Sequence, residues 1–143
     1  EFGCAAAGAK LIVVVGYNRC IAVQSAIDSV QGKQPSYIRG CEYLKPIVQS
    51  LETVVRENDA SNRQDRNEKQ TRGMTDTETI VRRNVQRSVN EILQKSTAIS
   101  ELVESGQVGI VGMVYDVTTG ICHVMNETSC GIATIKPDDS REL

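Results

Sequence analysis

The sequence predicts an α/β protein of three layers, αβα, with a mostly parallel sheet and an antiparallel strand at its edge. Two apolar runs, within residues 10–16 and 108–117, have the length and the β-branched composition of buried strands. Between them, apolar residues recur at the spacing of amphipathic helices. A strand, a helical crossover and a second strand form a parallel pair, and such connections are right-handed in nearly all proteins.

Length and composition narrow the possible classes of protein. The chain has 143 residues, which suffice for one domain with one core. Its net charge of −2, its interspersed charges and its lack of Trp argue against nucleic-acid binding. No apolar run reaches the roughly 20 residues that span a bilayer, and no signal peptide is visible. Five scattered cysteines form no CxxC pair, which favours a reducing compartment, so we expect a cytoplasmic protein.

The first strand and the helix after it come from "LIVVVGYNRCIAV", residues 11–23. We expect the strand over residues 10–16 to be fully buried, because the run is continuously apolar. Asn18 or Arg19 then leads into a helix that ends near Gly32. The inner face of that helix is predicted to contain Ala22, Val23, Ala26, Ile27 and Val30.

Three further helical stripes precede the return to the sheet. The first contains Pro46, which fits only in a first turn, and the third ends at Gly106. Residues 57–73 hold no large apolar side chain and are expected to form a surface excursion. Thr75 with Glu78 makes a capping box for the second helix. The three apolar faces are Leu44, Ile47, Val48, Leu51, Val54 and Val55; Ile80, Val81, Val85, Val89, Ile92 and Leu93; and Ile99, Leu102 and Val103.

The C-terminal part of the chain returns to the sheet. The second strand, within residues 108–117, is followed by the turn "TTG" and a short antiparallel strand over residues 121–125. We therefore divide the chain into a domain over residues 1–125 and a polar tail over residues 126–143. The positions that we expect to be buried include Ile12, Val14, Val23, Leu51, Val85, Val89, Ile110 and Val114.

Cys20 is the first candidate for a functional residue. It follows the first strand closely, and ligands of open parallel sheets collect beyond the carboxyl ends of the strands. A helix N-terminus stabilises a thiolate, so a cysteine there is a candidate nucleophile or metal ligand. The alternative is that Cys20 is a small apolar residue that packs the helix against the sheet. Spacing alone leaves both interpretations open.

A family resemblance bears on this cysteine. "AGAKLIVVVGYNRCIAVQSAID" resembles the signature of β-class carbonic anhydrases, in which a buried strand runs into Gly-His-x-x-Cys-Gly-Ala. The resemblance continues through "GCEYLKPIVQSLE", "IVRRNVQRSVNEIL" and "ISELVESGQVGIVGMVYDVTTGICHV", and so covers about residues 2–125. It implies a zinc ion held by two cysteines and one histidine, with an aspartate or a water as fourth ligand. The zinc-bound hydroxide of such enzymes attacks CO2.

Matched to that signature, the chain departs from it at the metal ligands. Cys20 takes the position of the second cysteine, Tyr17 stands where the histidine belongs, and Ile21 replaces the glycine that follows. The first cysteine belongs to a Cys-x-Asp-x-Arg motif that precedes the matched region and has no counterpart in place. The resemblance therefore implies an incomplete zinc site, with Cys20 as a residual ligand position and Tyr17 not expected to bind. Zinc, the cofactor of the family, is doubtful in this chain.

A count of possible ligands agrees with that interpretation. A catalytic zinc usually takes three protein ligands. The single histidine, His123, is adjacent to Cys122 on a predicted strand, and neighbouring residues of a strand point to opposite faces. The phenol of Tyr17, with an unperturbed pKa of about 10, is a poor ligand. A site at Cys122 or Cys130 stays possible, without a recognisable ligand spacing to support it.

Two functions from different classes follow. One is a carbonic anhydrase, which hydrates CO2 reversibly to bicarbonate, inactive here because metal ligands are lost. The other is a non-catalytic structural, regulatory or bicarbonate-binding domain associated with an anion transporter, since "GCEYLKPIV" is also similar to carbonic anhydrase-like domains of transporters.

The resemblance also bears on partners. The family's sheet has two further parallel strands, and N-terminal helices that wrap around a dimer partner precede this region. Because the chain begins with Glu1 rather than Met, we expect it to be a segment of a longer protein. Without the preceding strands, the first strand would expose an apolar edge. We therefore expect either that a longer chain supplies those strands or that a homodimer covers the edge.

Overall fold

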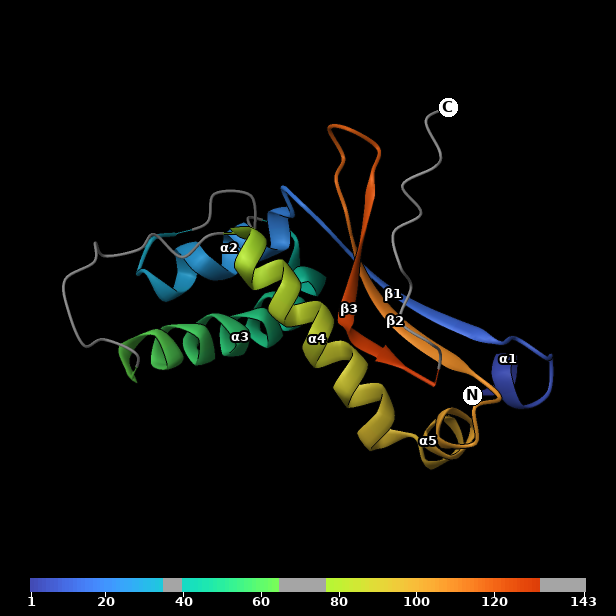
Figure 1. Cartoon of the computed structure of the whole chain (residues 1–143). Coiled ribbons are helices and arrows are strands. Elements are labelled where there is room, and N and C mark those ends of the chain that lie inside the picture. Colours follow the sequence, from blue (N-terminus) through green and yellow to red (C-terminus); the bar gives the residue numbers. More distant parts are fainter. Residues whose placement is uncertain (35–39, 65–76, 132–143) are drawn as a thin grey trace. The chain divides into compact units, whose positions relative to one another are not determined.

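The computed structural model describes residues 1–34, 40–64 and 77–131 (Figure 1). The chain divides into two units, which we describe separately. The first comprises residues 1–15, 85–115 and 121–143, and the second comprises residues 16–84 and 116–120. Among the described helices, none combines the length and the apolar character needed to cross a membrane.

The described elements follow the predicted order of a strand, several helices and two strands. Helix α1 and the short 3-10 helix η2 were not among the predicted elements. In chain order the elements are α1 (Phe2–Ala5), β1 (Leu11–Tyr17), α2 (Ile21–Val30), η2 (Glu42–Leu44), α3 (Lys45–Gln64), α4 (Thr77–Lys95), α5 (Thr97–Glu104), β2 (Gly109–Tyr115) and β3 (Cys122–Cys130).

The three strands form one mixed sheet in the order β1-β2-β3. Strands β1 and β2 start side by side, where the Gly109 N–H donates to the Lys10 carbonyl at 2.8 Å, and they run in the same direction (Figure 1). Strand β3 is antiparallel to β2, with Tyr115 opposite Cys122 and Ile110 opposite Cys130. The predicted fold class, an α/β fold with a parallel pair and an antiparallel edge strand, is confirmed.

Strand β3 is longer than predicted, since it continues past residue 125 to Cys130. Its polar second half is held by Thr128, which is 1% exposed. The Thr128 hydroxyl accepts from the Gly112 N–H at 2.6 Å and donates to the Met125 carbonyl at 2.7 Å. The register of β2 and β3 shifts between Ile110 and Gly112, beside these bonds. The threonine thus satisfies backbone groups that a bulge removes from regular pairing. Residues 132–143 of the predicted tail lie outside the described residues.

The prediction that the first strand is fully buried was wrong. Side chains of β1 alternate between exposed and half-buried along the whole strand. Ile12 and Val14, which we expected in the core, are only half-buried. The physical reason is that β1 lies at one end of the described sheet and only one of its faces is covered. The other predicted core positions, Val23, Leu51, Val85, Val89, Ile110 and Val114, are buried as expected.

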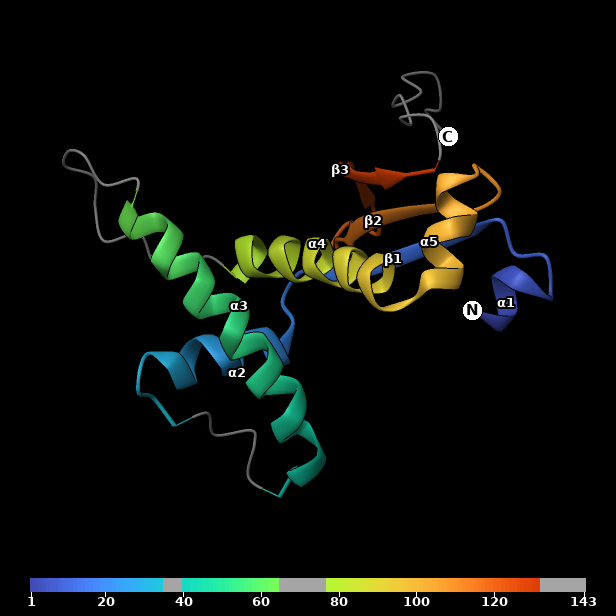
Figure 2. The ribbon, with the colours of Figure 1, turned by 90° about the horizontal axis from the view of Figure 1, so that it is seen from below.

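In the first unit, helices α4 and α5 cover the inner face of the strands (Figures 1 and 2). Val89 of α4 and Ile99 of α5 pack with Ile110 of β2 in one cluster, against which Ile12 and Val14 also pack. Ser96 caps α5, because its hydroxyl accepts from the Ile99 N–H at 3.2 Å. The helix ends before Gly106, whose φ of 70° is the left-handed backbone predicted for a stop signal.

In the second unit, α2 packs on α3. Pro46 lies in the first turn of α3, as predicted. Where α2 and α3 meet, the Ser29 hydroxyl donates to Glu52 at 2.6 Å. Helix α3 continues to Gln64, into the segment that we expected to be a surface excursion; residues 65–73 of that segment, and Thr75 of the predicted capping box, lie outside the described residues. The buried apolar residues of these two helices are Val23, Ala26, Ile27, Val48, Leu51, Val54 and Val55.

Candidate functional site

The corner between β1 and α2 contains both residues that the sequence singled out for a metal site. Tyr17 is the last residue of β1, and Cys20 is the N-cap of α2, with an extended backbone. Between them, Arg19 has a φ of 57° and is the one described non-glycine residue in the left-handed region. That backbone conformation costs about 1–3 kcal/mol and persists only where neighbouring groups hold it. Residues 17–20 therefore form a strained turn, which places Cys20 at the N-terminus of α2.

Cys20 affects the acidity of Tyr17. A hydrogen bond with Cys20 raises the pKa of the Tyr17 phenol above its ordinary value, and the negative charge of a Cys20 thiolate and partial burial act in the same direction. Cys20 is half-buried and Tyr17 is 47% exposed. The structure thus places the two predicted site residues, a phenol and a thiol, three positions apart at one corner, where Cys20 influences the pKa of Tyr17.

A turn after β2 meets this corner, and sequence analysis missed it. The Asn18 amide donates to Asp116 Oδ1 at 2.7 Å, and Asn18 Oδ1 accepts from the Val117 N–H at 3.0 Å. Asp116 also accepts from the Thr118 N–H at 2.8 Å and from the Thr119 hydroxyl at 2.9 Å. The Thr118 N–H, and after it Asn18 and Thr119, hold the pKa of the Asp116 carboxyl well below its usual range. The signal was present in "YDVTTG", where an Asp followed by Thr and Gly is typical of an Asx turn.

A pocket of about 490 Å³ opens beside Cys20 in the second unit. Among the residues that line it are Arg19, Gln24 and Glu78. The Thr77 hydroxyl donates to Gln24 at 3.1 Å, which joins the first turn of α4 to α2. A volume of this size suits a small polar ligand. The remaining lining residues are Asn18, Cys20, Ile21 and Thr77.

The donor groups of this corner do not fit the zinc that the resemblance implies. Cys20 supplies one sulfur, Tyr17 supplies a phenol in the place of an imidazole, and both oxygens of Asp116 already accept hydrogen bonds. Across residues 1–34, 40–64 and 77–131, no three His, Cys, Asp or Glu side chains gather closely enough to hold a metal ion. A catalytic zinc usually takes three such ligands. The corner therefore holds one member of a ligand set.

The other candidate ligands belong to the first unit. Cys122 and His123 are exposed at the start of β3, opposite Tyr115 and Val114. Cys130, at the end of β3, is half-buried and packs against the cluster that contains Val89 and Ile110. Cys122 and His123 are thus consecutive residues at one end of β3, and Cys130 lies at the other end.

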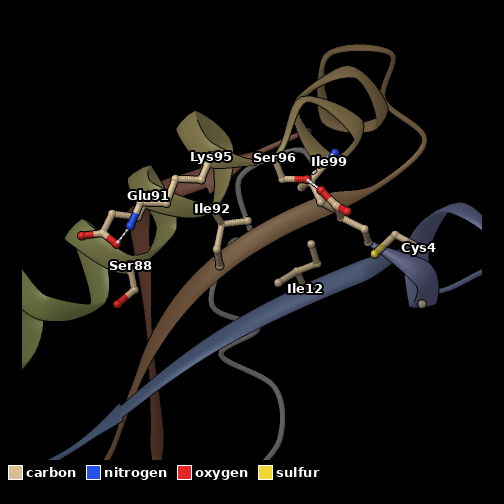
Figure 3. Close-up of a pocket in the computed structure, with 10 residues that line it drawn as sticks. Cys4, Ile12, Ser88, Glu91, Ile92, Lys95, Ser96 and Ile99 are labelled. Atoms are coloured by element: carbon tan, nitrogen blue, oxygen red, sulfur yellow. Dashed lines mark hydrogen bonds and ion pairs between the residues drawn. The ribbon is translucent and has the colours of Figure 1, made fainter. Parts of the chain in front are cut away.

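A larger pocket, of about 690 Å³, lies in the first unit (Figure 3). Ile12, Ile92 and the thiol of Cys4 face it in Figure 3. On its rim, Lys95 lies 2.7 Å from a carboxylate oxygen of Glu91. Lys95 and, after it, Arg87 lower the pKa of Glu91 through hydrogen bonds. None of the predicted site residues lines this pocket, and the Glu91 and Lys95 side chains on its rim pair with each other, so the corner at Cys20 is the better candidate site.

Solved structures share this fold. The b-carbonic anhydrase CafA of the fungal pathogen Aspergillus fumigatus matches 88% of this chain with a TM-score of 0.61 at 20% identity, over 53% of its own chain. The beta-carbonic anhydrase CcaA matches 88% of this chain with a TM-score of 0.57 at 19% identity, over 51% of its own. The chain thus spans about half the length of these relatives. No match was found among curated proteins.

At such identities, structural likeness shows the fold alone, and the assignment to a family depends on the sequence. A family model described as carbonic anhydrase matches residues 1–122, which is most of the chain. The match includes both strands of the parallel pair and the corner at Cys20. The chain therefore belongs to the β-carbonic anhydrase family.

Proposed function

We propose that this chain is a carbonic anhydrase-family domain whose metal site is degenerate, so that the chain alone does not hydrate CO2. The observation that supports the proposal is the pairing of Tyr17 with Cys20. In the family signature, a histidine and a cysteine occupy these two positions as zinc ligands. Here a phenol stands in the histidine position, at the end of the strand that leads to the cysteine.

The chemistry of that pair disfavours a metal. A phenol binds zinc only as its anion, and the pKa of Tyr17 is raised, so the phenol stays protonated at neutral pH. One remaining thiolate gives weak, exchangeable binding, because the stability of zinc sites comes from several converging ligands. This chain would therefore keep the fold of the family without its metal-dependent chemistry.

Zinc content and CO2 hydration test the proposal together. The chain, purified with zinc present, is expected to carry well under one zinc per molecule and to accelerate CO2 hydration no faster than buffer. Tyr17→His should add at most partial zinc that chelators strip easily, because two ligands leave the ion open to water. Tyr17→Phe is the matched control, since it removes the phenol without adding an imidazole. Stoichiometric zinc in the unaltered chain that is lost in Cys20→Ser would overturn the proposal and direct the search to Cys122, His123 and Cys130.

The second candidate is a non-catalytic, regulatory domain that binds bicarbonate, in association with an anion transporter. The presence of Arg19 in the pocket beside Cys20, next to the first turn of α2, favours this candidate, because a guanidinium and backbone N–H groups both attract anions. Titration with ¹³C-bicarbonate followed by NMR tests it. Binding that Arg19→Gln weakens would support it, whereas Arg56→Gln on α3, outside the pocket, is the control. No binding up to physiological bicarbonate concentrations would contradict it.

We also propose that the chain works in a reducing compartment, the cytoplasm. The support is that all five cysteines, Cys4, Cys20, Cys41, Cys122 and Cys130, are free thiols in the structure. Proteins of oxidising compartments usually pair such residues.

We further propose that copies of this chain associate along β1, as a homodimer. The exposed side chains of Leu11, Val13 and Val15 lie in a row on a strand that ends the described sheet. Apolar edge strands without charges, Pro or bulges are common sites of strand-to-strand association.

A further inference from the structure

We propose that Asn18 is a positioning residue, which latches the corner of residues 17–20 to the turn of residues 116–120 and so keeps Cys20 half-buried at the start of α2. The inference deepens the proposed function, because it concerns the same corner, and it relies on that function only for the corner's importance. The experiment below uses neither metal nor CO2, so the two can fail separately.

The latch uses both ends of one amide. Asn18 Nδ2 donates to Asp116 at 2.7 Å, and Asn18 Oδ1 accepts from the Val117 N–H at 3.0 Å, across 98 and 99 residues of sequence. A side chain with both amide ends engaged by one partner segment cannot rotate without breaking two hydrogen bonds. Asn18 thus fixes the backbone of the corner, and not only its own position.

The far end of the latch is itself fixed. Thr118 and Thr119 donate to the Asp116 carboxylate at 2.8 and 2.9 Å, and the Gly120 N–H donates to the Asp116 carbonyl at 2.8 Å. Gly120 has a φ of 78°, which closes the turn in a conformation that glycine adopts easily. Two hydrogen bonds to the carboxylate and one to the backbone carbonyl therefore fix Asp116, in addition to its bond with Asn18.

Arg19 explains why the corner needs a latch. Its φ of 57° is disfavoured for a residue with a Cβ and persists only where the surroundings determine it. On one side, the latch holds Asn18. On the other, the Gln24 N–H donates to the Cys20 carbonyl at 3.0 Å and begins α2. Hydrogen bonds thus hold both neighbours of Arg19, Asn18 and Cys20, in place. Without the latch, Arg19 is free to relax to a right-handed or extended backbone, which changes the path of the chain before Cys20 and uncovers its sulfur.

Alkylation of individual cysteines tests this inference in the whole chain. Iodoacetamide pulses, with each modified peptide quantified by mass spectrometry, give a rate for every thiol in one sample. In Asn18→Ala, the rate at Cys20 is expected to rise about tenfold relative to exposed Cys41, because an opened corner uncovers the sulfur. The rate at half-buried Cys130, in the first unit, should stay unchanged and reports any general unfolding.

Two matched variants separate positioning from lost stability. Thr119→Val removes a hydrogen bond to the same carboxylate without touching Asn18, and should change the Cys20 rate less than about twofold. Asn18→Asp keeps the size of the side chain and the acceptor for Val117 but repels Asp116, so it should open the corner even if Asn18→Ala folds poorly. An unchanged Cys20 rate in Asn18→Asp, or an equal increase in Thr119→Val, would overturn the proposal.

A double-mutant cycle with Arg19→Gly tests the mechanism directly. Glycine adopts a positive φ without penalty, so the corner should keep its shape in this background even when the latch is absent. Asn18→Ala is therefore expected to raise the Cys20 rate about tenfold with Arg19 present and less than about twofold with Gly in its place. Equal effects of Asn18→Ala in both backgrounds would show that the latch does not act through the strained residue, and would overturn the inference.

Discussion

Strands β1 and β2 have nearly the same composition and very different surroundings. "LIVVVGY" and "GIVGMVY" are both seven residues long, both contain no charged residue, and both end in Tyr. Yet β2 is buried at almost every position, whereas β1 alternates between exposed and half-buried. The comparison shows that the place of a strand in the sheet, and not its composition, decides how much of it is buried.

The difference has a simple geometric cause. Strand β2 has a neighbour on each side, and helices cover its inner face (Figures 1 and 2). Strand β1 has a described neighbour only in β2, and Leu11, Val13 and Val15 point away from the cluster that Ile12 and Val14 join. A continuously apolar strand is typical of a sheet covered on both faces. The sequence of β1 therefore suits a more enclosed position than the described residues provide.

Matched truncations in the two strands should show the largest effect. Ile110→Ala in β2 is expected to lower the free energy of unfolding by about 2–5 kcal/mol, because Ile110 is 0% exposed and its removal leaves a cavity. Leu11→Ala in β1 should cost about 1 kcal/mol or less, since Leu11 is 47% exposed. Urea denaturation followed by circular dichroism measures both values. Equal losses would mean that β1 is covered in solution.

Gly112 tests how tightly β2 is enclosed. A Cβ at this position would lie 2.6 Å from Val85 Cγ1 and 2.8 Å from Thr128 Oγ1, both too close for real contacts. Gly112→Ala should therefore destabilise the chain by about 1–3 kcal/mol through overpacking. The matched change in β1 is Val13→Ala, at an exposed position, which should cost less than about 0.5 kcal/mol. A Gly112→Ala variant as stable as the parent would show that the bulge of β3 opposite Gly112 can yield.

The carboxyl end of β2 should give a smaller, pH-dependent effect. The folded-state pKa of Asp116 is lowered, so its stabilising contribution is fully present above the unfolded value of about 3.9 and is lost as the pH falls through the folded value. Asp116→Asn should therefore lower the melting temperature at pH 7, and the difference from the parent should shrink as the pH falls below about 4.

Thermal melts of both proteins between pH 7 and pH 3 measure this difference. Glu127→Gln, at an exposed carboxylate on β3, is the control and should show no comparable narrowing. A constant difference between the parent and Asp116→Asn at every pH would mean that the loss comes from geometry and not from the charge of the carboxylate.

The fold could be predicted because its signals are local. Pro46 marks the first turn of α3 and Gly106 marks the end of α5, and each works through its own backbone preferences. The end of β3 could not be predicted in this way. Residues 126–130 are mostly polar, and they continue the strand because Thr128 bonds the backbone at Gly112, sixteen positions away.

In the candidate site, too, the features with a local sequence signal could be predicted and those that depend on distant contacts could not. Family resemblance located Tyr17 and Cys20, because both belong to one short motif whose spacing survives in the sequence. It did not locate the bond between Asn18 and Asp116, which joins residues 98 positions apart. The strain at Arg19 was also invisible, since nothing about an arginine indicates a left-handed backbone. Residues that act through contacts distant in sequence require a structure to be found.

The smallest effect on stability is expected at the middle of β1, where the largest effect on association is also expected. Val13 is 40% exposed, so Val13→Lys should change the free energy of unfolding by no more than about 0.5 kcal/mol. A lysine on an edge strand opposes pairing with another strand, because its charge would have to be desolvated or placed beside its own copy. Sedimentation velocity should therefore show a concentration-dependent dimer for the parent and a monomer for Val13→Lys.

Ile121→Lys is the matched control, because it adds the same charge at an exposed apolar residue outside β1 and should leave the dimer intact. A parent chain that sediments as a monomer, or a dimer that both variants dissolve equally, would show that β1 is not the surface through which copies associate.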